Sequence, residues 1–467
     1  MKRHRIRTII VGGVFAAPLL TGVSTYAAAP TITINDSDQN LYAQGANADH
    51  TVTYDLESNT LKLANFHGDR VSISGLEDLT ILLEGENSLT MADDGSNIGQ
   101  FKAIYAPHVN LTFTGDGSLT VEDQTPDVEK DIHSSIVQLN DFILDGPTLD
   151  LSFNVGRCIE AKNNGGWSRP GVTIIESGTL KLQNCSGAFS NMKDITVNGG
   201  SVEINNVNEV AYTNEAPRNF NISGGLYRAN VRSGAGIRAD ESINISGGEV
   251  YVNGSYYAIE MTEQFQSIGS NNKRIFSISG GLLDIESGTL GGIKVAYINS
   301  ESYIDFSGGT IIFHNNTIGK NGPLAMIAYR EENDKNIILG KKMNVYPEGM
   351  SVQVTSAEGM IGYSGYAYYL ASKTDTAVIT DDPTKIPDYT EELPDEIPET
   401  SGGEEEAEET AEEESDVKTP DTGIFSGETE QSTLLAISLG AVAATTSVLG
   451  LALYATKRFA ARAKFNK

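Results

Sequence analysis

Two segments of the chain contain side chains suited to holding a sugar. The segment KNNGGWSRPG contains the only Trp of the chain, Trp167, close to Arg169. The segment TEQFQSIGSNNKR contains Phe265 and Lys273. Aromatic rings cover the apolar face of a sugar while polar donors reach its hydroxyl groups. These four side chains are the candidate ligand-binding residues. The alternative for Trp167 is that its ring only covers the chain beneath it.

No pattern typical of catalysis accompanies these segments. The six His residues have no metal-ligand spacing, so we expect neither a catalytic residue nor a transition-metal site. Calcium is the one ion that the sequence leaves open, because residues 36–40 and 122–127 offer hard oxygen ligands. Neither segment matches an established calcium loop, and solvated loops are the alternative. The pattern favours a binding protein without a cofactor over an enzyme.

A repeat runs through most of the chain. The decapeptide INISGGEVYV at residues 243–252 has relatives such as FNISGGLYRA at 220–229 and FSISGGLLDI at 276–285. Positions equivalent to its second glycine, Gly248, recur every 22–33 residues. They are Asn59, Asn87, Gly117, Pro147, Gly178, Gly200, Gly225, Gly281 and Gly309.

The residues that follow these positions alternate between apolar and polar with the period of a β-strand. Two and four residues after each position the side chain is apolar or aromatic, and the residue between them is mostly polar. Alternation with a period of two and one buried face predicts strands rather than helices. We expect one interior row from the residues two positions on, which are Leu61, Leu89, Leu119, Leu149, Leu180, Val202, Tyr227, Val250, Leu283 and Ile311.

Each repeat contains two further strand-like pieces. One precedes the glycine turn, and the other follows later, as in Gly236-Ile237-Arg238-Ala239 and Ala258-Ile259-Glu260-Met261. Three short strands per repeat predict one coil of a parallel β-helix, which is stable only when it stacks on its neighbours. We therefore expect an all-β fold, a right-handed parallel β-helix of about ten coils.

The expected β-helix covers residues 28–375, with residues 30–50 and 340–375 as its caps. The two candidate segments, residues 162–171 and 262–274, both follow a third strand. We expect them on one edge, four coils or ~19 Å apart.

The two cysteines present a choice between a disulfide and free thiols. Cys158 occupies the small buried position of a third strand, and Cys185 lies three residues before the equivalent Ala188 of the next coil. Three extended residues cover ~10 Å, which is too far for an unstrained disulfide unless the turn bends back. The spacing therefore predicts two reduced, mostly buried thiols.

The N-terminus and the segment after the body have the composition of targeting and linker sequences. Residues 1–27 combine a basic start, an apolar run and a stretch of small residues, which is the layout of a secretory signal peptide. Residues 376–418 form an acidic, Pro- and Glu-rich linker that cannot bury a core and is expected to be disordered. Within it, residues 381–418 supply −15 of the formal −29 charge. The body also leans acidic, which argues against nucleic acid as a partner.

Residues 419–467 resemble the sorting signals of Gram-positive surface proteins. Thr419-Pro420-Asp421-Thr422-Gly423 precedes an apolar segment at 434–454, which is long enough to cross a bilayer, and a basic tail typical of the cytoplasmic side. The resemblance implies that a sortase cleaves between Thr422 and Gly423 and joins the chain to peptidoglycan. Thr419 stands where that family has Leu, and without cleavage the segment would be a single-pass membrane anchor. In both cases the body is exported and faces outside.

The body resembles pectin-lyase-like β-helices in architecture. It also resembles carbohydrate-binding β-helix proteins of bacterial surfaces, in phrases such as LTILLEGENSLTM and LTFTGDGSLTV. It lacks the lyases' recognisable clusters of Asp, His, Arg and Lys on consecutive coils. The resemblance implies a non-catalytic protein that binds polysaccharide or a neighbouring or host cell surface. The alternatives are a protein-binding adhesin and a polysaccharide lyase or hydrolase.

Overall fold

The computed structural model describes most of the repeated body and leaves both chain ends out. The described residues are 29–35, 40–91, 102–123, 135–152, 156–162, 171–211, 216–261, 273–286, 288, 290–298, 302–314, 324–329, 337–348, 350–356, 366–370, 374 and 376–386. Within them the fold is all-β, as the sequence predicts, with one short helix, α1 (Leu41–Gln44), and one 3-10 turn, η1 (Pro383–Lys385). The expected signal peptide, the sorting signal and its apolar segment 434–454 lie outside the described residues. Within the described part, no helix is long and apolar enough to span a membrane.

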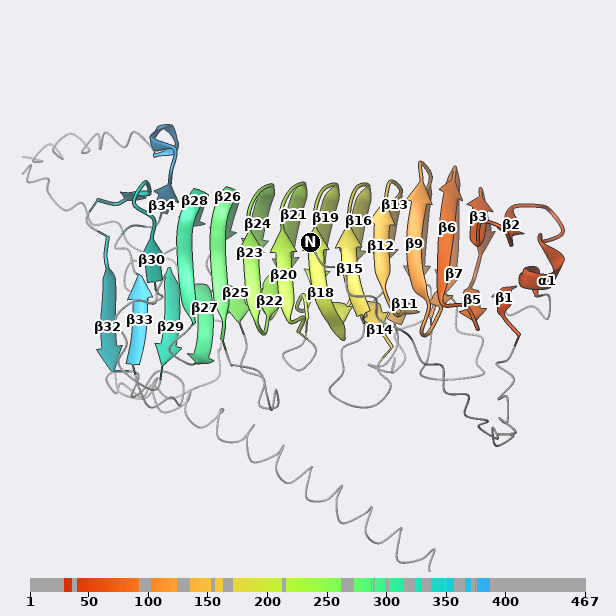
Figure 1. Cartoon of the computed structure of the whole chain (residues 1–467), viewed down its shortest axis with the longest axis horizontal. Helices are drawn as coiled ribbons and strands as arrows, with labels where there is room; N and C mark the ends of the chain where they lie inside the picture. The colour runs from red at the N-terminus through yellow and green to blue at the C-terminus, as the bar shows by residue number, and fades with distance from the viewer. Residues whose placement is uncertain are drawn as a thin grey trace, which may run out of the picture. The chain divides into compact units, whose positions relative to one another are not determined.

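The strands that precede each glycine turn form one parallel ladder, in which neighbouring repeats lie side by side (Figure 1). We call them first strands. In ladder order they are β6 (Asp78–Glu84), β9 (Asn110–Gly115), β12 (Phe142–Asp145), β15 (Gly171–Ile175), β18 (Met192–Val197), β20 (Asn219–Ile222), β23 (Ser242–Ile245) and the beginnings of β26 (Ile275–Glu286) and β28 (Tyr303–His314).

The strands that follow the turn, the second strands, form an equivalent parallel ladder. They are β7 (Glu86–Met91), β10 (Ser118–Asp123), β13 (Thr148–Ser152), β16 (Thr179–Gln183), β19 (Ser201–Val207), β21 (Leu226–Val231), β24 (Glu249–Asn253) and the ends of β26 and β28. The predicted interior row is confirmed from Leu119 to Ile311, where each member pairs with the next and all are buried.

The predicted row is wrong at its first two members. Leu61, on β3 (Thr60–Ala64), pairs with Ile81 and so belongs to the first-strand ladder. Leu89 pairs with Val121 rather than with Leu119. The reason is that first and second strands alternate with the same period of two, so the pattern does not tell one ladder from the other.

Asn87 takes the interior place opposite Leu119 and is buried. Its Oδ1 accepts from the backbone N–H of Phe66 at 2.9 Å, and its Nδ2 donates to the carbonyls of Glu84 and Ser118 at 3.2 and 3.0 Å. Burying a polar amide is tolerated when its hydrogen bonds are made. The strand register therefore follows these bonds and not the spacing of the leucines.

The repeated glycines are required by the turn between first and second strands. Gly248 has φ +79°, and a Cβ added to it would lie 2.7 Å from the carbonyl oxygen of Gly225 in the preceding repeat. Gly200, Gly225, Gly281 and Gly309 also have positive φ. Only glycine combines this backbone conformation with so close an approach.

The third strands form two further sheets. The first contains β5 (Val71–Ser74), β8 (Ile104–Tyr105), β11 (Ser135–Leu139), β14 (Arg157–Ala161) and β17 (Gly187–Ser190) in parallel. The second contains β22 (Ile237–Ala239), β25 (Tyr257–Met261), β27 (Gly291–Ile298) and β29 (Ala325–Tyr329), also in parallel. Hydrogen bonds from Ala188 N–H to Glu209 O and from Val210 N–H to Ala235 O lead from one sheet to the other.

Antiparallel strands close both ends of the ladders. At the N-terminal end β1 (Thr31–Ile34) pairs with β5, β2 (Val52–Asp55) pairs with β3, and β4 (His67–Gly68) extends parallel to β7. At the other end β33 (Tyr366–Leu370) pairs with β29 and β32 (Val352–Ser356), and β34 (Ala377–Thr380) pairs with β28 and β31 (Asn344–Tyr346). β30 (Ile337–Leu339) continues the first-strand ladder in parallel. The sheet thus extends past residue 375, where composition places the end of the body.

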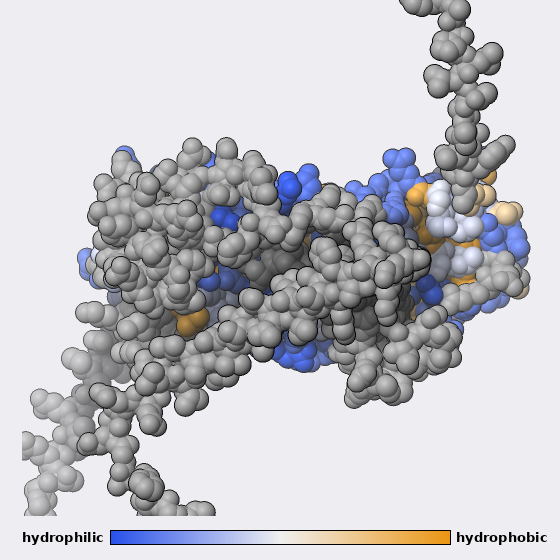
Figure 2. All heavy atoms as spheres, turned by 90° about the horizontal axis from the view of Figure 1, so that it is seen from below, coloured by the Kyte–Doolittle hydropathy of each residue, from blue (hydrophilic) through white to orange (hydrophobic). Residues whose placement is uncertain are grey.

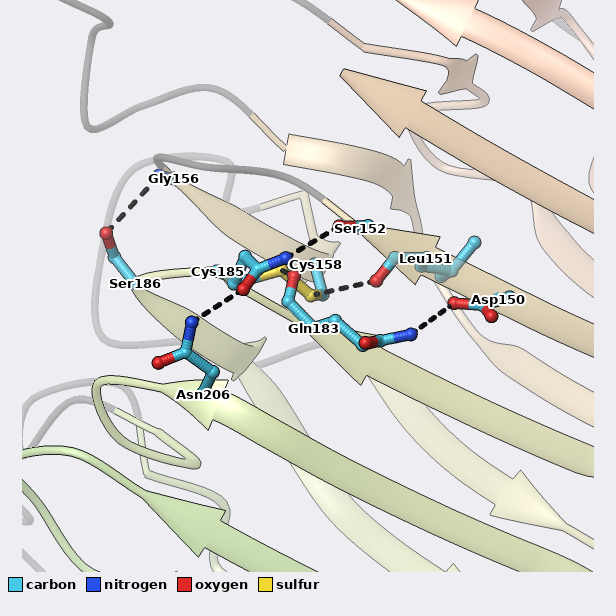
Figure 3. Close-up of a disulfide and its surroundings, with 10 residues drawn as sticks. Asp150, Leu151, Ser152, Gly156, Cys158, Gln183, Cys185, Ser186 and Asn206 are labelled. Carbon is cyan, nitrogen blue, oxygen red and sulfur yellow. Dashed lines mark hydrogen bonds between the residues drawn. A yellow bond between two sulfur atoms is a disulfide. The ribbon is translucent and has the colours of Figure 1, made fainter. Parts of the chain in front are cut away.

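The prediction of two reduced thiols is wrong. Cys158 and Cys185 form a disulfide with their Cα atoms 5.8 Å apart, and both are fully buried. Asn184, with φ +62°, turns the chain directly after β16. The chain between β16 and β17 is therefore not fully extended, and the separation expected for an extended strand does not apply (Figure 3).

Candidate functional site

Each candidate segment lies between the end of a third strand and the start of a first strand, and the two first strands begin at the same edge of their ladder. β14 ends at Ala161 and β15 begins at Gly171, whereas β25 ends at Met261 and β26 begins at Ile275. Four successive strand pairings link the start of β15 to the start of β26. The residues paired in turn are Val172, Asp194, Asn219, Ser242 and Ile275. The predicted spacing of the flanks is confirmed. Trp167, Arg169 and Phe265 lie outside the described residues, whereas Lys273 lies inside them.

A chain of polar side chains runs along the strands between the two flanks. Asn219 Nδ2 donates to Asp194 Oδ1 at 2.6 Å, and Ser242 Oγ donates to Asn219 Oδ1 at 2.7 Å. Asn244 Nδ2 donates to Ser242 Oγ at 3.1 Å. All four are partly exposed. We call Asp194, Asn219 and Ser242 the loop-edge row. Its amide and hydroxyl groups both donate and accept hydrogen bonds, as sugar hydroxyls require.

Three charged side chains lie beside the loop-edge row. Lys193, Arg218 and Glu241 have side chains that are 49%, 49% and 41% exposed. Arg218 Nε lies 3.8 Å from Glu241 Oε1, and Lys193 Nζ lies 3.8 Å from Asp194 Oδ2. Exposed pairs of this length contribute little to stability. These charges can therefore exchange their partners for a ligand at small cost.

Lys273 is exposed, as a ligand-binding residue must be. Its Nζ lies 5.8 Å from the centroid of the Tyr303 ring on the next first strand. Tyr303 is partly exposed, and its N–H donates to Arg274 O at 3.0 Å. The sequence interpretation named Lys273 but missed Tyr303, which could have been found by aligning the start of β28 with that of β26. The pair places an aromatic face and a cation at one end of the edge.

Asp141 stands at the other end of the edge. Its Oδ1 accepts from the Val172 N–H at 3.0 Å, where β15 begins. Burial raises the pKa of Asp141 above its ordinary value, against the opposing effect of the Val172 hydrogen bond. The edge therefore carries a carboxyl group that is easier to protonate than an exposed Asp.

A second group, on the outer face of the third strands, was missed in the sequence. Glu209, Arg238, Glu260 and Lys294 come from consecutive repeats, and we call them the charged row. Arg238 pairs with Glu209 through Nη1 and with Glu260 through Nη2, the latter at 2.7 Å. Lys294 Nζ donates to Glu260 Oε1 at 2.9 Å. The sequence interpretation excluded only the lyases' catalytic clusters of Asp, His, Arg and Lys and did not name this row. The signal was nevertheless present, because Arg238 and Glu260 share the third position of the recurring motif.

The charged row has the electrostatics of a positioning network rather than of an acid–base pair. Burial raises the pKa of Glu260, but the charges of Lys294 and Arg238 outweigh it, so its pKa lies below the ordinary value. Glu260 therefore stays ionised at neutral pH and does not donate a proton. A general acid requires a raised pKa. Glu209 and Glu260 share one guanidinium, which holds both carboxylates in place.

The described residues offer no cluster of three His, Cys, Asp or Glu that could hold a metal ion. Of the two calcium candidates, residues 36–39 and 124–127 lie outside the described residues. Asn40, at the edge of the first, uses its Oδ1 to accept from the N–H groups of Ile32 and Tyr42 at 3.0 and 3.1 Å. That oxygen caps α1.

Figure 2 shows the molecule from below, the side on which most third strands lie in Figure 1. The described surface visible in the middle of this view is mainly hydrophilic, and apolar side chains gather toward the N-terminal end.

Comparison with known proteins places the chain in a family. A family model described as "carbohydrate-binding domain-containing protein" matches residues 45–291, which is more than half of the chain. No curated protein and no solved structure matches the chain. Both candidate segments, the loop-edge row and most of the charged row lie inside the matched range. The chain belongs to the family of carbohydrate-binding domain-containing proteins.

Proposed function

We propose that this protein is a non-catalytic carbohydrate-binding protein whose ligand lies along the edge between the two candidate segments. The family match carries the proposal, because residues 45–291 include both segments. The flanking strands support it, because β15 and β26, which follow the two segments, begin at one edge four repeats apart. With strands ~4.8 Å apart, that edge offers ~19 Å for a chain of several sugars.

The proposed site has a polar floor and aromatic walls. The loop-edge row Asp194, Asn219 and Ser242 is the floor, and its hydrogen bonds hold the side chains before a ligand arrives. Trp167 and Phe265 are the proposed walls, which would cover the apolar faces of sugar rings. Arg169 and Lys273 add charged donors. A floor ordered in advance reduces the entropy lost on binding.

The proposed architecture is a right-handed parallel β-helix. Its support is the pairing of three kinds of strand, each parallel and in register with its equivalent in the next repeat. Each repeat then exposes equivalent edges, so that a linear ligand meets similar groups at each step.

We also propose that the protein is exported and held at the cell surface. The N-terminal segment 1–27, the acidic linker and the Thr419–Gly423 motif support this proposal. A buried disulfide adds to it, since disulfides persist mainly outside the cytosol. Fractionation of cells with and without a sortase tests the anchor. Covalent attachment to peptidoglycan that disappears in sortase-deficient cells and in a Thr422→Ala variant is expected. A membrane-bound chain in every case would contradict sortase anchoring and indicate a single-pass anchor.

A glycan array with the full chain tests carbohydrate binding. Signals on a restricted set of glycans are expected, and the variants Trp167→Ala and Phe265→Ala should lose them. Leu56→Ala is the matched control, because Leu56 is 62% exposed and lies on the turn between β2 and β3, and β3 is four ladder steps from β15, where the proposed site begins. An array without signal would overturn the proposal and favour a protein-binding adhesin. Release of unsaturated or reducing sugars would overturn its non-catalytic part.

A further inference from the structure

The corner between second and third strands carries a row of side-chain amides separate from the loop edge. Asn184 follows β16 and Asn206 lies near the end of β19, and both have left-handed backbone with φ of +62° and +54°. Asn184 Nδ2 donates to Ser152 Oγ at 2.9 Å, and Asn206 Nδ2 donates to Asn184 Oδ1 at 2.7 Å (Figure 3). We call Ser152, Asn184 and Asn206 the corner row.

The corner row is accessible and holds unused hydrogen-bonding capacity. Asn206 is exposed, and Ser152 and Asn184 are partly exposed. Each amide has two N–H donors and two acceptor lone pairs, and the bonds along the row use only part of them. Gln183 Nε2 donates to Asp150 Oδ1 at 2.7 Å on the strands that lead into the corner. This bond occupies the neighbouring carboxylate.

The corner row lies over a rigid base. Cys185 follows Asn184 directly and is joined to the buried Cys158 of the preceding repeat (Figure 3). Ser186 N–H donates to Gly156 O at 2.7 Å beside it. The disulfide therefore ties together two repeats that contribute neighbouring members of the row. Groups fixed in this way lose little entropy when a ligand binds.

The same corner exposes an aromatic ring two repeats beyond Asn206. Tyr256, after β24, is 57% exposed, and Leu290, at the same corner of the next repeat, is 38% exposed. The Leu290 N–H donates to Tyr256 O at 2.9 Å, which places the two residues on adjacent repeats. On the other side, Ser255 N–H donates to the carbonyl of Gly234, which carries no side chain. Tyr256 and Leu290 are therefore exposed residues paired through the backbone on adjacent repeats, and the partner of Ser255 on the other side is a glycine.

The repeat between the amides and the ring supplies further donors. Arg232 and Ser233 are both exposed at this corner. Arg232 N–H bonds to Val207 O at 2.8 Å and Ser233 N–H to Asn208 O at 2.9 Å, which keeps the repeat in line with its neighbours. From Ser152 to Leu290 the corner thus presents polar groups followed by an apolar platform, one repeat every ~4.8 Å.

We propose that this corner binds a linear chain of N-acetylated amino sugars laid along the stacking direction. An acetamido group has one N–H and one carbonyl, which complement the free acceptor and donor of an Asn amide. Its methyl group and the ring face of the sugar fit Tyr256 and Leu290. The strand spacing is close to the length of one sugar in an extended chain. This inference names the ligand class within the proposed carbohydrate-binding function, and it uses a face other than the loop edge.

The test compares two oligosaccharide series of equal length, chains of N-acetylglucosamine and chains of glucose, with the full chain in calorimetry. The acetylated chains should bind at least about tenfold more tightly, since each acetamido group adds hydrogen-bonded contacts that glucose lacks. Asn206→Ala and Tyr256→Ala should each weaken binding about 3- to 10-fold, as lost stacking or hydrogen bonds do. Tyr256→Phe keeps the ring and should bind like the wild type.

The variants separate this inference from the function on which it depends. Loss of binding in Trp167→Ala, with Asn206→Ala and Tyr256→Ala unaffected, would leave the carbohydrate-binding proposal intact and overturn the corner site. Equal affinity for glucose and N-acetylglucosamine chains would also overturn it. No binding of either series, together with a silent glycan array, would overturn both proposals. A circular dichroism melt of each variant shows whether a loss of binding reflects unfolding.

Discussion

Cys158 and Cys185 are 27 residues apart in sequence, and their Cα atoms lie 5.8 Å apart because the chain turns at Asn184 directly before the second cysteine. The bond joins one repeat to the next beneath the corner row of Ser152, Asn184 and Asn206. It thus links the packing of the body to a surface that we propose to bind ligand.

Removing the disulfide should destabilise the body. We expect the double variant Cys158→Ala/Cys185→Ala to lose about 2–4 kcal/mol in free energy of unfolding, because its unfolded chain is no longer cross-linked. Urea unfolding with and without a reductant measures the loss. The wild type should shift to lower urea concentration on reduction and the double variant should not. Identical curves for the oxidised wild type and the double variant would contradict the prediction.

Removing the guanidinium at the centre of the charged row should cost more than removing an exposed one. The side chain of Arg238 is 7% exposed, and Arg238→Met leaves Glu209 and Glu260 without their shared cation. We expect a loss of about 3–5 kcal/mol, the typical cost of breaking a buried ion pair. Arg218→Met is the control, with a side chain 49% exposed and an expected loss below about 1 kcal/mol. Equal losses of unfolding free energy for the two variants, measured in urea, would show that burial of the arginine does not determine the cost of removing it.

The Glu260 carboxylate should make stability depend on acid. Its folded pKa lies below the ordinary 4.5 because Lys294 and Arg238 outweigh the effect of burial. A depressed folded pKa adds stability above the unfolded pKa, and this is lost as the pH falls through the folded value. Glu260→Gln should therefore be less stable than the wild type at pH 7, with the gap closing below about pH 4. A gap that stays constant with pH would show that charge is not its cause.

Asp141 should make stability depend on pH in the opposite direction to Glu260. Burial raises its folded pKa above the unfolded value, so the charged form opposes folding at neutral pH and stability increases as the pH falls through the folded pKa. Asp141→Asn keeps an oxygen that can accept from Val172 N–H and should be more stable than the wild type at pH 7. Thermal melts between pH 3 and 7 should show this advantage disappearing in acid. An Asp141→Asn variant less stable than the wild type at pH 7 would contradict this prediction.

The glycine turn should not tolerate a side chain at Gly248. Alanine there would hold φ near +79° with its Cβ 2.7 Å from Gly225 O. We expect Gly248→Ala to lose at least about 1–3 kcal/mol from backbone strain alone. Ser246→Ala, in the same turn, is the control and removes only a long 3.5 Å contact to Ile222 O. Similar melting temperatures for the two variants would show that the turn can relax.

The Lys273 side chain should contribute to ligand binding and little to folding. Lys273→Ala removes an exposed cation from above Tyr303 and should weaken glycan binding about 3- to 10-fold, as the loss of one polar contact does. Lys62→Ala is matched in charge, and its side chain is 37% exposed in a pair with Glu84. Binding should be unchanged in this control. Equal effects would point to overall charge rather than to the site.

The sequence predicted most of the second-strand ladder correctly but not the strands at its N-terminal end. From Leu119 to Ile311 the apolar residues after each turn form the expected row, because a period of two with one buried face allows few other arrangements. The same period marks the strands before each turn. For this reason the pattern places Leu61 in the wrong ladder and does not indicate that Asn87 is an interior residue.

The candidate site, too, could be predicted from the sequence only in part. Counting repeats placed the flanks of both segments on one edge, since each third strand leads into the next first strand. The charged row could have been found by aligning Arg238 with Glu260 in the recurring motif. The ionised state of Glu260 could not, because it depends on how far burial and two neighbouring cations offset each other.

The sequence by itself determined the all-β class, the glycine turns and the common edge of the strands that flank the two candidate segments. These follow from patterns that repeat along the chain, and stacking turns a repeat in sequence into a row in space. Only the tertiary structure decided the disulfide, the register of β3 and β7, and the ionised state of Glu260. Each of these depends on how a corner bends, as at Asn184, or on side chains that meet across repeats, and no period in the chain encodes either one.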